Sequence, residues 1–234
     1  MGFPHTPTTS DRRGPKAMAV AGLLAALGAM VLGAWLIAVV RDDPPPAPLS
    51  LANTLSPVTP QPASAIVGPV LARSTPVSLR IPAIGVASQL IGLGKNKDGT
   101  VEVPAPGPNY NRAGWYRPSP TPGSLGPAVI IGHVDSATER RSVFFKLGSL
   151  KPGARVEVSR VDGITAIFEV DAIRRYNRNA FPTQLVYGNT NHAALRLITC
   201  GGPIDPKTGH YRDNVIVWAS LVGPTPAPTP MLEP

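Results

Sequence analysis

The sequence is poor in cysteine, in charged residues and in aromatic residues. Of its 234 residues one is Cys, 15% are charged and 6% are aromatic, whereas a soluble domain usually has about 25% charged residues. One Cys cannot close an internal disulfide or build a cysteine-rich zinc module, so both classes are excluded. The His residues show no metal-binding spacing such as H-E-x-x-H, and we expect no metal site.

Proline is abundant and unevenly distributed. Nine of the 29 prolines lie in residues 42–76 and five in residues 224–234. Proline favours an extended backbone and does not nucleate a core. These positions predict a Pro-rich linker over 41–76 and a disordered Pro-rich tail over 224–234.

Residues 17–40 contain no charged side chain. As a helix, these 24 residues would span about 36 Å, against about 30 Å for the hydrocarbon core of a bilayer. Arg12, Arg13 and Lys16 precede the segment, so the positive-inside rule places residues 1–16 in the cytoplasm and the rest outside the cell. The prediction is one uncleaved transmembrane anchor. A cleaved signal peptide is the alternative, although its apolar region would be only about 7–15 residues long.

Residues 77–223 are long enough for one core and are rich in short β-type runs. The runs are separated by turn signals such as Lys151-Pro152-Gly153, and alternation is clear at Val77, Leu79 and Ile81. This pattern predicts an all-β barrel or sandwich, with room for a short helix in 142–150 and another in 182–187. The predicted strands are 77–81, 100–103, 128–134, 154–160, 164–173, 193–200 and 214–222.

Three residues are candidates for chemistry. Cys200 ends an apolar run; a lone Cys is often buried and inert, but an unpaired thiol outside the cell is unusual without a use. If 193–200 and 214–222 pair antiparallel, Arg212 would face Cys200 across the loop, where its charge could favour a thiolate or an oxyanion. The alternative for Arg212 is a solvated strand end. His133 ends another run and could equally be structural, and a serine triad through Ser136 is disfavoured because no G-x-S-x-G motif is present.

Three motifs contain these candidates: Gly132-His133-Val134-Asp135-Ser136, Leu197-Ile198-Thr199-Cys200 and Tyr211-Arg212-Asp213-Asn214. Taken together, these motifs resemble the sortase family of Gram-positive cell-surface transpeptidases, and more narrowly its actinobacterial class F type. The resemblance covers about residues 77–222, and the anchor and spacer fit the same layout. One position departs from it, because Arg196 stands where the family motif Thr-Leu-x-Thr-Cys has its first Thr.

The resemblance implies a closed eight-stranded β-barrel with a Cys–His–Arg site. By position, Cys200 would be the nucleophile, His133 the acid and base, and Arg212 the stabiliser of an oxyanion or of the substrate. The implied reaction cleaves an LPxTG-like sorting signal of a secreted protein through a Cys thioester, and an amine of a peptidoglycan precursor then accepts the acyl group. The resemblance implies no cofactor.

Other readings remain open at this stage. The same fold could act as a hydrolase if water resolved the thioester, or the chain could be a non-catalytic anchored domain that binds wall material. An L,D-transpeptidase is disfavoured because Ile198-Thr199 precede Cys200 in place of Ser-His-Gly. Residues 77–223 carry a formal charge of +7 (17 Lys and Arg, 10 Asp and Glu). Outside the cell this charge favours diffuse attraction to anionic lipids or wall polymers over nucleic acid, or is simply a solvated basic surface.

Overall fold

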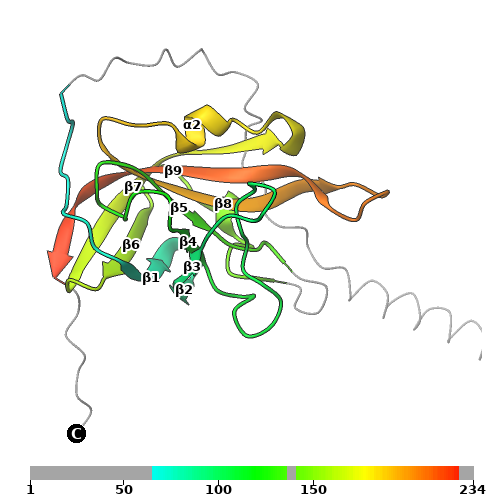
Figure 1. Cartoon of the computed structure of the whole chain (residues 1–234), viewed down its shortest axis with the longest axis horizontal. Coiled ribbons are helices and arrows are strands. Elements are labelled where there is room, and N and C mark those ends of the chain that lie inside the picture. The colour runs from blue at the N-terminus through cyan, green and yellow to red at the C-terminus, as the bar shows by residue number, and fades with distance from the viewer. Residues whose placement is uncertain (1–64, 136–140, 227–234) are drawn as a thin grey trace, which may run out of the picture. The chain divides into compact units, whose positions relative to one another are not determined.

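The computed structural model describes residues 65–135 and 141–226 (Figure 1). The predicted cytoplasmic segment 1–16, the anchor 17–40 and most of the linker 41–76 lie outside these residues, as does most of the tail 224–234. No helix within the described residues has the length and apolar character needed to cross a membrane.

The described chain is built mainly of β-strands, with one short α-helix, α2, and three 3-10 helices. In chain order the elements are β1 (Pro76–Ile81), η1 (Pro82–Ile84), β2 (Val86–Gln89), β3 (Ile91–Leu93), β4 (Gly114–Tyr116), β5 (Gly126–Ile131), η2 (Leu147–Ser149), β6 (Arg155–Arg160), β7 (Ile164–Asn177), η3 (Arg178–Ala180), α2 (Thr183–Tyr187), β8 (Ala193–Ile204) and β9 (Tyr211–Pro226).

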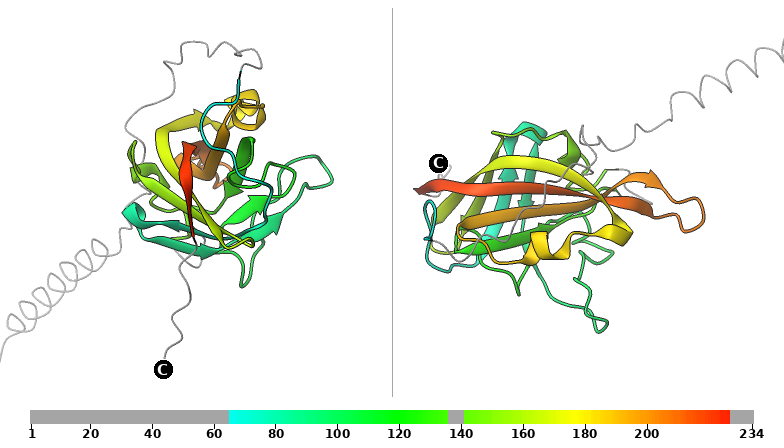
Figure 2. Two further views of the ribbon diagram at one scale, coloured as in Figure 1. Left: turned by 90° about the vertical axis from the view of Figure 1, so that its left-hand side faces the viewer. Right: turned by 90° about the horizontal axis from the view of Figure 1, so that it is seen from above.

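All the described strands belong to one sheet that curls into a nearly closed barrel (Figure 2). The strand order is β2-β1-β6-β7-β9-β8-β5-β4-β3, so the two edge strands are neighbours in sequence. The backbone changes partner between them: Leu90 N donates to Val77 O at 2.8 Å, and Ile91 N donates to Ala113 O at 3.1 Å. The prediction of eight strands is therefore wrong by one, because the segment 86–93 is divided at Leu90 into two strands on opposite edges of the sheet.

Two apolar clusters lie on the two faces of the sheet. The cluster inside the barrel includes Phe144, Phe168, Leu195 and Leu197, all fully buried. Burial of such a side chain stabilises the fold by about 1.5–3 kcal/mol. The second cluster lies on the outer face, where residues of β5, β8 and β9 pack with α2 and its flanking aromatic residues. Because β8 carries apolar residues on both faces, its sequence is a nearly continuous apolar run.

The long predicted strands are confirmed, and the errors concern short segments. Residues 100–103 form only an isolated bridge, between Lys95 and Val101. In this segment the side chain of Glu102 accepts a hydrogen bond from Gly94 N at 2.5 Å, which holds Glu102 close to the chain that precedes the turn. The strands β2, β3 and β4 were missed because three or four residues give too little alternation to recognise. The short helix expected within 182–187 is confirmed as α2.

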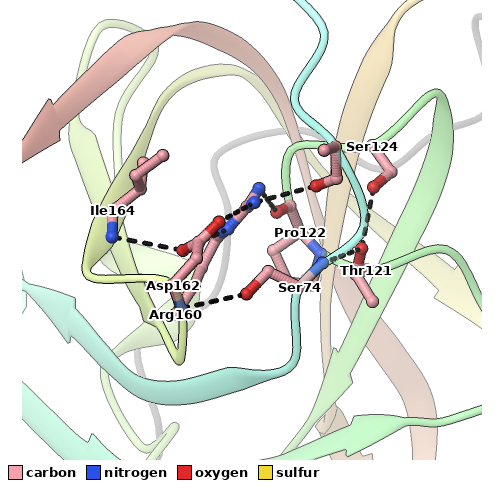
Figure 3. Close-up of polar contacts among 8 residues, drawn as sticks. Ser74, Thr121, Pro122, Ser124, Arg160, Asp162 and Ile164 are labelled. Carbon is pink, nitrogen blue, oxygen red and sulfur yellow. Dashed lines mark hydrogen bonds and ion pairs between the residues drawn. The ribbon is translucent and has the colours of Figure 1, made fainter.

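The end of the predicted linker contacts the barrel through residues 65–75, which we call the strap. Its main anchor is Arg160, a side chain at the end of β6 whose residue is only 3% exposed. The guanidinium donates to Ala72 O at 2.8 Å and to Pro122 O at 3.0 Å, and it pairs with the carboxylate of Asp162 at 2.5 Å. The hydroxyl of Ser74 accepts from Asp162 N at 3.2 Å (Figure 3). These bonds fix the path by which the chain enters β1.

Candidate active site

Cys200 lies on the outer face of β8, in the half of the strand that leads to the β8–β9 turn. The β8–β9 ribbon projects beyond the other strands at this end (Figure 1). Side chains alternate along a strand, and Leu195, Leu197 and Thr199 point inward, where all three are buried. Cys200 therefore points outward, and it is exposed. Directly across the ladder from it lies Asn214 of β9.

His133 follows β5, the parallel neighbour of β8. The register places Ile131 opposite Ile198, and Gly132 N donates to Ile198 O at 3.1 Å. Two residues beyond the end of β5, continuation of the same register would place the backbone of His133 opposite Cys200. Gly132 is required at this point, because a Cβ there would lie 2.7 Å from Cδ2 of Phe144.

Arg212 approaches Cys200 from the other side, on β9. It lies two residues before Asn214, at the point where the pairing of β8 with β9 shifts register between Gly201 and Ile204. Its side chain is 52% exposed, and Nε lies 3.8 Å from Oδ2 of Asp205 in the β8–β9 turn. The strand register thus brings the three predicted site residues to one end of three adjacent strands.

The surroundings of Cys200 disfavour its ionised form. Although the residue keeps an exposed surface, burial by the neighbouring protein raises the pKa of its thiol above the ordinary value, and the negative charge of Asp135 raises it further. The positive charge of Arg178, in η3, opposes both effects. At neutral pH the sulfur is therefore mainly a thiol, and a proton acceptor or a nearby cation is needed to make the nucleophile. Arg178 was not predicted, since nothing in its local sequence indicates its approach to Cys200.

The imidazole of His133 is held by several residues outside the predicted site. Its Nε2 lies 2.8 Å from Pro104 O, and its ring stacks on Tyr110, with centroids 4.0 Å apart and planes 4° from parallel. Tyr110 in turn donates its hydroxyl to the backbone oxygen of Asp135 at 3.0 Å. The Asp135 carboxylate accepts a short hydrogen bond from the hydroxyl of Tyr211. Asp135 follows His133 by two residues, which was the one available sequence signal for this arrangement.

Arg196, the departure from the family motif, also points to the outer face of β8. It is 5% exposed, and its guanidinium carbon lies 4.2 Å from the ring centroid of Trp218, its cross-strand neighbour. Burial lowers the pKa of Arg196 to about 10, and its Nε has no hydrogen-bond partner in the described part of the chain. The substitution therefore places a cation, stacked on an indole, four residues before Cys200 on the same face.

The remaining candidate features carry no evident chemistry. His192 contacts Asn191, and burial lowers the pKa of its imidazole, while His210 is exposed in the β8–β9 turn. Within residues 65–135 and 141–226, no group of three or more His, Cys, Asp or Glu side chains could hold a metal ion. A surface cavity of about 250 Å³ includes none of the predicted site residues. It is lined by Ile84, Gly85, Val86, Ala87, Asn111, Arg141, Ser142, Val143, Phe145 and Lys146.

A family model and several solved structures are similar to this chain. A family model for the sortase domain matches residues 79–222. No curated protein sequence matches the chain. Among solved structures, Listeria monocytogenes sortase A is similar with a TM-score of 0.50 at 17% identity, over 69% of this chain and 95% of that one.

Two further solved structures are similar to the chain at lower TM-scores. Sortase A from Corynebacterium diphtheriae has a TM-score of 0.49 at 24% identity, over 69% of this chain and 66% of that one. The sortase D5 transpeptidase of Clostridium perfringens has a TM-score of 0.47 at 21% identity, over 64% and 79%.

Proposed function

Because the chain belongs to the sortase family, we propose that it is a membrane-anchored cysteine transpeptidase that joins secreted proteins to the cell wall. The observation that carries the proposal is the register of β5, β8 and β9, which supports a site made of His133, Cys200 and Arg212. The uncharged segment 17–40 would anchor the chain with residues 1–16 in the cytoplasm. The barrel would then work outside the cell.

The first half of the proposed reaction forms a thioester. The Cys200 thiolate attacks the carbonyl carbon of the Thr–Gly bond in an LPxTG-like sorting signal, and Arg212 stabilises the oxyanion that develops. The C–N bond then breaks, and protonated His133 gives its proton to the leaving amine. The products are an acyl thioester on Sγ and a free amino group on the released segment.

The second half transfers the acyl group to an amine of a peptidoglycan precursor. The amine nitrogen attacks the thioester carbon, neutral His133 takes up a proton from it, and the C–S bond breaks to restore the thiolate. The raised pKa of Cys200 fits this sequence, because a less stable thiolate is a more reactive nucleophile once it forms. The basic surface of the barrel would draw the enzyme to anionic lipids or wall polymers through a salt-dependent attraction.

The test is incubation of the full chain with an LPxTG-type peptide and an excess of amine, followed by mass spectrometry. We expect an acyl adduct on Cys200 and an amine-linked product, and neither in Cys200→Ala. His133→Ala should lose about 10²–10⁴-fold in rate, and Arg212→Ala about 10²–10³-fold. His210→Ala and Arg155→Ala, which remove exposed side chains of the same types, are the controls.

Three other outcomes of this assay would each contradict part of the proposal. Product formation by Cys200→Ala would refute cysteine catalysis. Release of free acid with no amine-linked product, at saturating amine, would make the enzyme a hydrolase. The absence of any adduct across LPxTG-type peptides would favour a non-catalytic wall-binding domain.

A further inference from the structure

We propose that Tyr110 is a positioning residue that, together with the Pro104 carbonyl, holds His133 in a single tautomer with Nδ1 free to exchange protons. This inference deepens the proposed function and rests on it for the role of His133. The structural part, one fixed tautomer held by a stacked tyrosine, is independent of turnover. We call the unit formed by Pro104, Tyr110, Asp135 and Tyr211 the imidazole clamp.

The tautomer follows from the hydrogen bond at Nε2. A backbone carbonyl only accepts hydrogen bonds, so at 2.8 Å from Pro104 O the ring nitrogen must carry the hydrogen and donate it. In the neutral ring the other nitrogen, Nδ1, then holds the lone pair. Nδ1 is therefore the atom that takes a proton from the incoming amine and returns one to the leaving amine.

The stack on Tyr110 fixes the plane of the imidazole. The two rings are almost parallel, 4° apart, with centroids at 4.0 Å. In this geometry the His133 ring cannot swing out of its plane without meeting the phenol ring. A ring turned by 180° about its Cβ–Cγ bond would lie in the same plane and could stack equally well, but Cε1 would then replace Nε2 and the bond to Pro104 O would be lost. Together the two contacts select one orientation.

Tyr110 is itself held by Asp135, and Asp135 is held in turn by Tyr211. Its hydroxyl donates to Asp135 O, and burial raises the pKa of Tyr110, so the hydroxyl keeps its proton at neutral pH. Asp135 is held by Tyr211, whose pKa is also raised by burial and by its bond to the Asp135 carboxylate. Because Tyr211 begins β9, one residue before Arg212, the clamp links the His133 loop to the strand that carries Arg212.

The loop that presents Tyr110 is anchored beside it. The Tyr110 N–H donates to Gly107 O at 3.0 Å within a turn, and the hydroxyl of Ser142 donates to Oδ1 of Asn111 at 2.8 Å. Pro104, at the start of this loop, is buried. The loop 104–112 is thus a fixed support for the imidazole, built from residues that flank neither His133 nor Cys200 in sequence.

The experiment combines kinetics with ¹⁵N NMR of the full chain labelled in its histidine rings. In the wild-type protein with neutral histidine rings, we expect the His133 signals, identified by their loss in His133→Gln, to show Nε2 protonated and Nδ1 bare. Tyr110→Leu, which removes the stack, should shift these signals toward an average of both tautomers. Tyr110→Phe keeps the ring and loses only the hydroxyl that donates to Asp135 O. This variant should therefore retain most of the wild-type pattern of signals.

We expect the two Tyr110 variants to rank in the same order in their kinetics as in their NMR signals. Tyr110→Leu should lower kcat by about tenfold or more while the KM for the peptide stays within about twofold, since misorientation of an acid–base group slows chemistry and leaves peptide binding intact. Tyr110→Phe should lose less than Tyr110→Leu. Asn109→Ala, an exposed residue of the same loop, is the matched control and should behave as wild type.

The outcomes separate this proposal from the proposed function. Protonation at Nδ1 in the wild-type protein overturns the clamp whatever the activity, and so does a Tyr110→Leu variant with unchanged kcat. A fixed Nε2–H tautomer in a protein that forms no product with any peptide would support the clamp and count against transpeptidation. If Tyr110→Leu fails to fold, the wild-type tautomer and the Tyr110→Phe kinetics still decide.

Discussion

Replacement of Arg160 by Met should destabilise the barrel and release the strap. The side chain is buried at the end of β6, and its bond to Ala72 O is one of several that tie residues 65–75 to the domain (Figure 3). Met has a similar length and is apolar, so it fills most of the space but donates no hydrogen bond. The substitution thus removes the charge and its bonds while keeping the packing.

The size of the effect can be worked out from the contacts. The guanidinium donates to two carbonyls, Ala72 O at 2.8 Å and Pro122 O at 3.0 Å, and bonds from a charged group contribute about 1.5–3 kcal/mol each. The pair with Asp162, whose side chain is 32% exposed, adds at most about 1 kcal/mol. Burial of the Met side chain offsets part of the loss. We expect a decrease of about 4 kcal/mol in the free energy of unfolding, or roughly 8–16 °C in Tm.

The assay is urea unfolding of the full chain in detergent, followed by tryptophan fluorescence, with limited trypsin digestion as a second readout. In Arg160→Met, cleavage after Arg73, an exposed residue of the strap, should become faster. Arg155→Met is the matched control, because Arg155 lies on the same strand and is exposed. Unfolding of Arg160→Met at the same urea concentration as Arg155→Met, with no faster cleavage, would refute the assignment of Arg160 as the anchor.

Two further predictions concern titration. The bond from Arg160 holds the pKa of Asp162 in the folded protein below its usual value of 3.8. Such a lowered pKa stabilises the fold at pH values above the usual pKa, and this stabilisation is lost as the pH falls through the pKa of the folded state. The stability advantage of the wild type over Asp162→Asn should therefore shrink as the pH is lowered below about 4, and a constant difference would contradict this. Burial raises the pKa of Cys200 and Arg178 opposes it, so Arg178→Gln should slow iodoacetamide alkylation at pH 8 and move its pH profile upward. Equal profiles for wild type, Arg178→Gln and the exposed control Arg155→Gln would show that Arg178 does not act on the thiol.

The site was predictable to the extent that its residues lie in recognisable local motifs. Cys200 and Arg212 flank one hairpin, so the antiparallel pairing of two predicted strands was enough to place them near each other. His133 is different, because it follows β5, a parallel neighbour of β8 separated from it by β6 and β7 in sequence. Its assignment to the site depended on the resemblance of the motifs, since no local periodicity determines which distant strands pair or in what register.

The residues around the site were beyond such reasoning. Tyr110 stacks on His133 from a loop, and Arg178 acts on the Cys200 thiol from the three-residue helix η3; neither segment shows a periodicity in its sequence. The strap was assigned to an extended linker from its prolines, yet Arg160 holds its backbone through the main-chain carbonyl of Ala72, a group that every residue type has. Because such contacts do not depend on the type of residue, the composition of a segment does not predict them.

The sequence by itself determined the β character of residues 77–223, the faces of the long strands and the chemical types in the site. These follow from alternation and composition, which act over a few neighbouring residues. Only the tertiary structure decided that the segment 86–93 divides at Leu90 to bring the sheet near closure, that Arg196 stacks on Trp218, and that His133 is clamped at Nε2. Each of these depends on which groups meet across the barrel, and that is a property of the packing of the whole sheet.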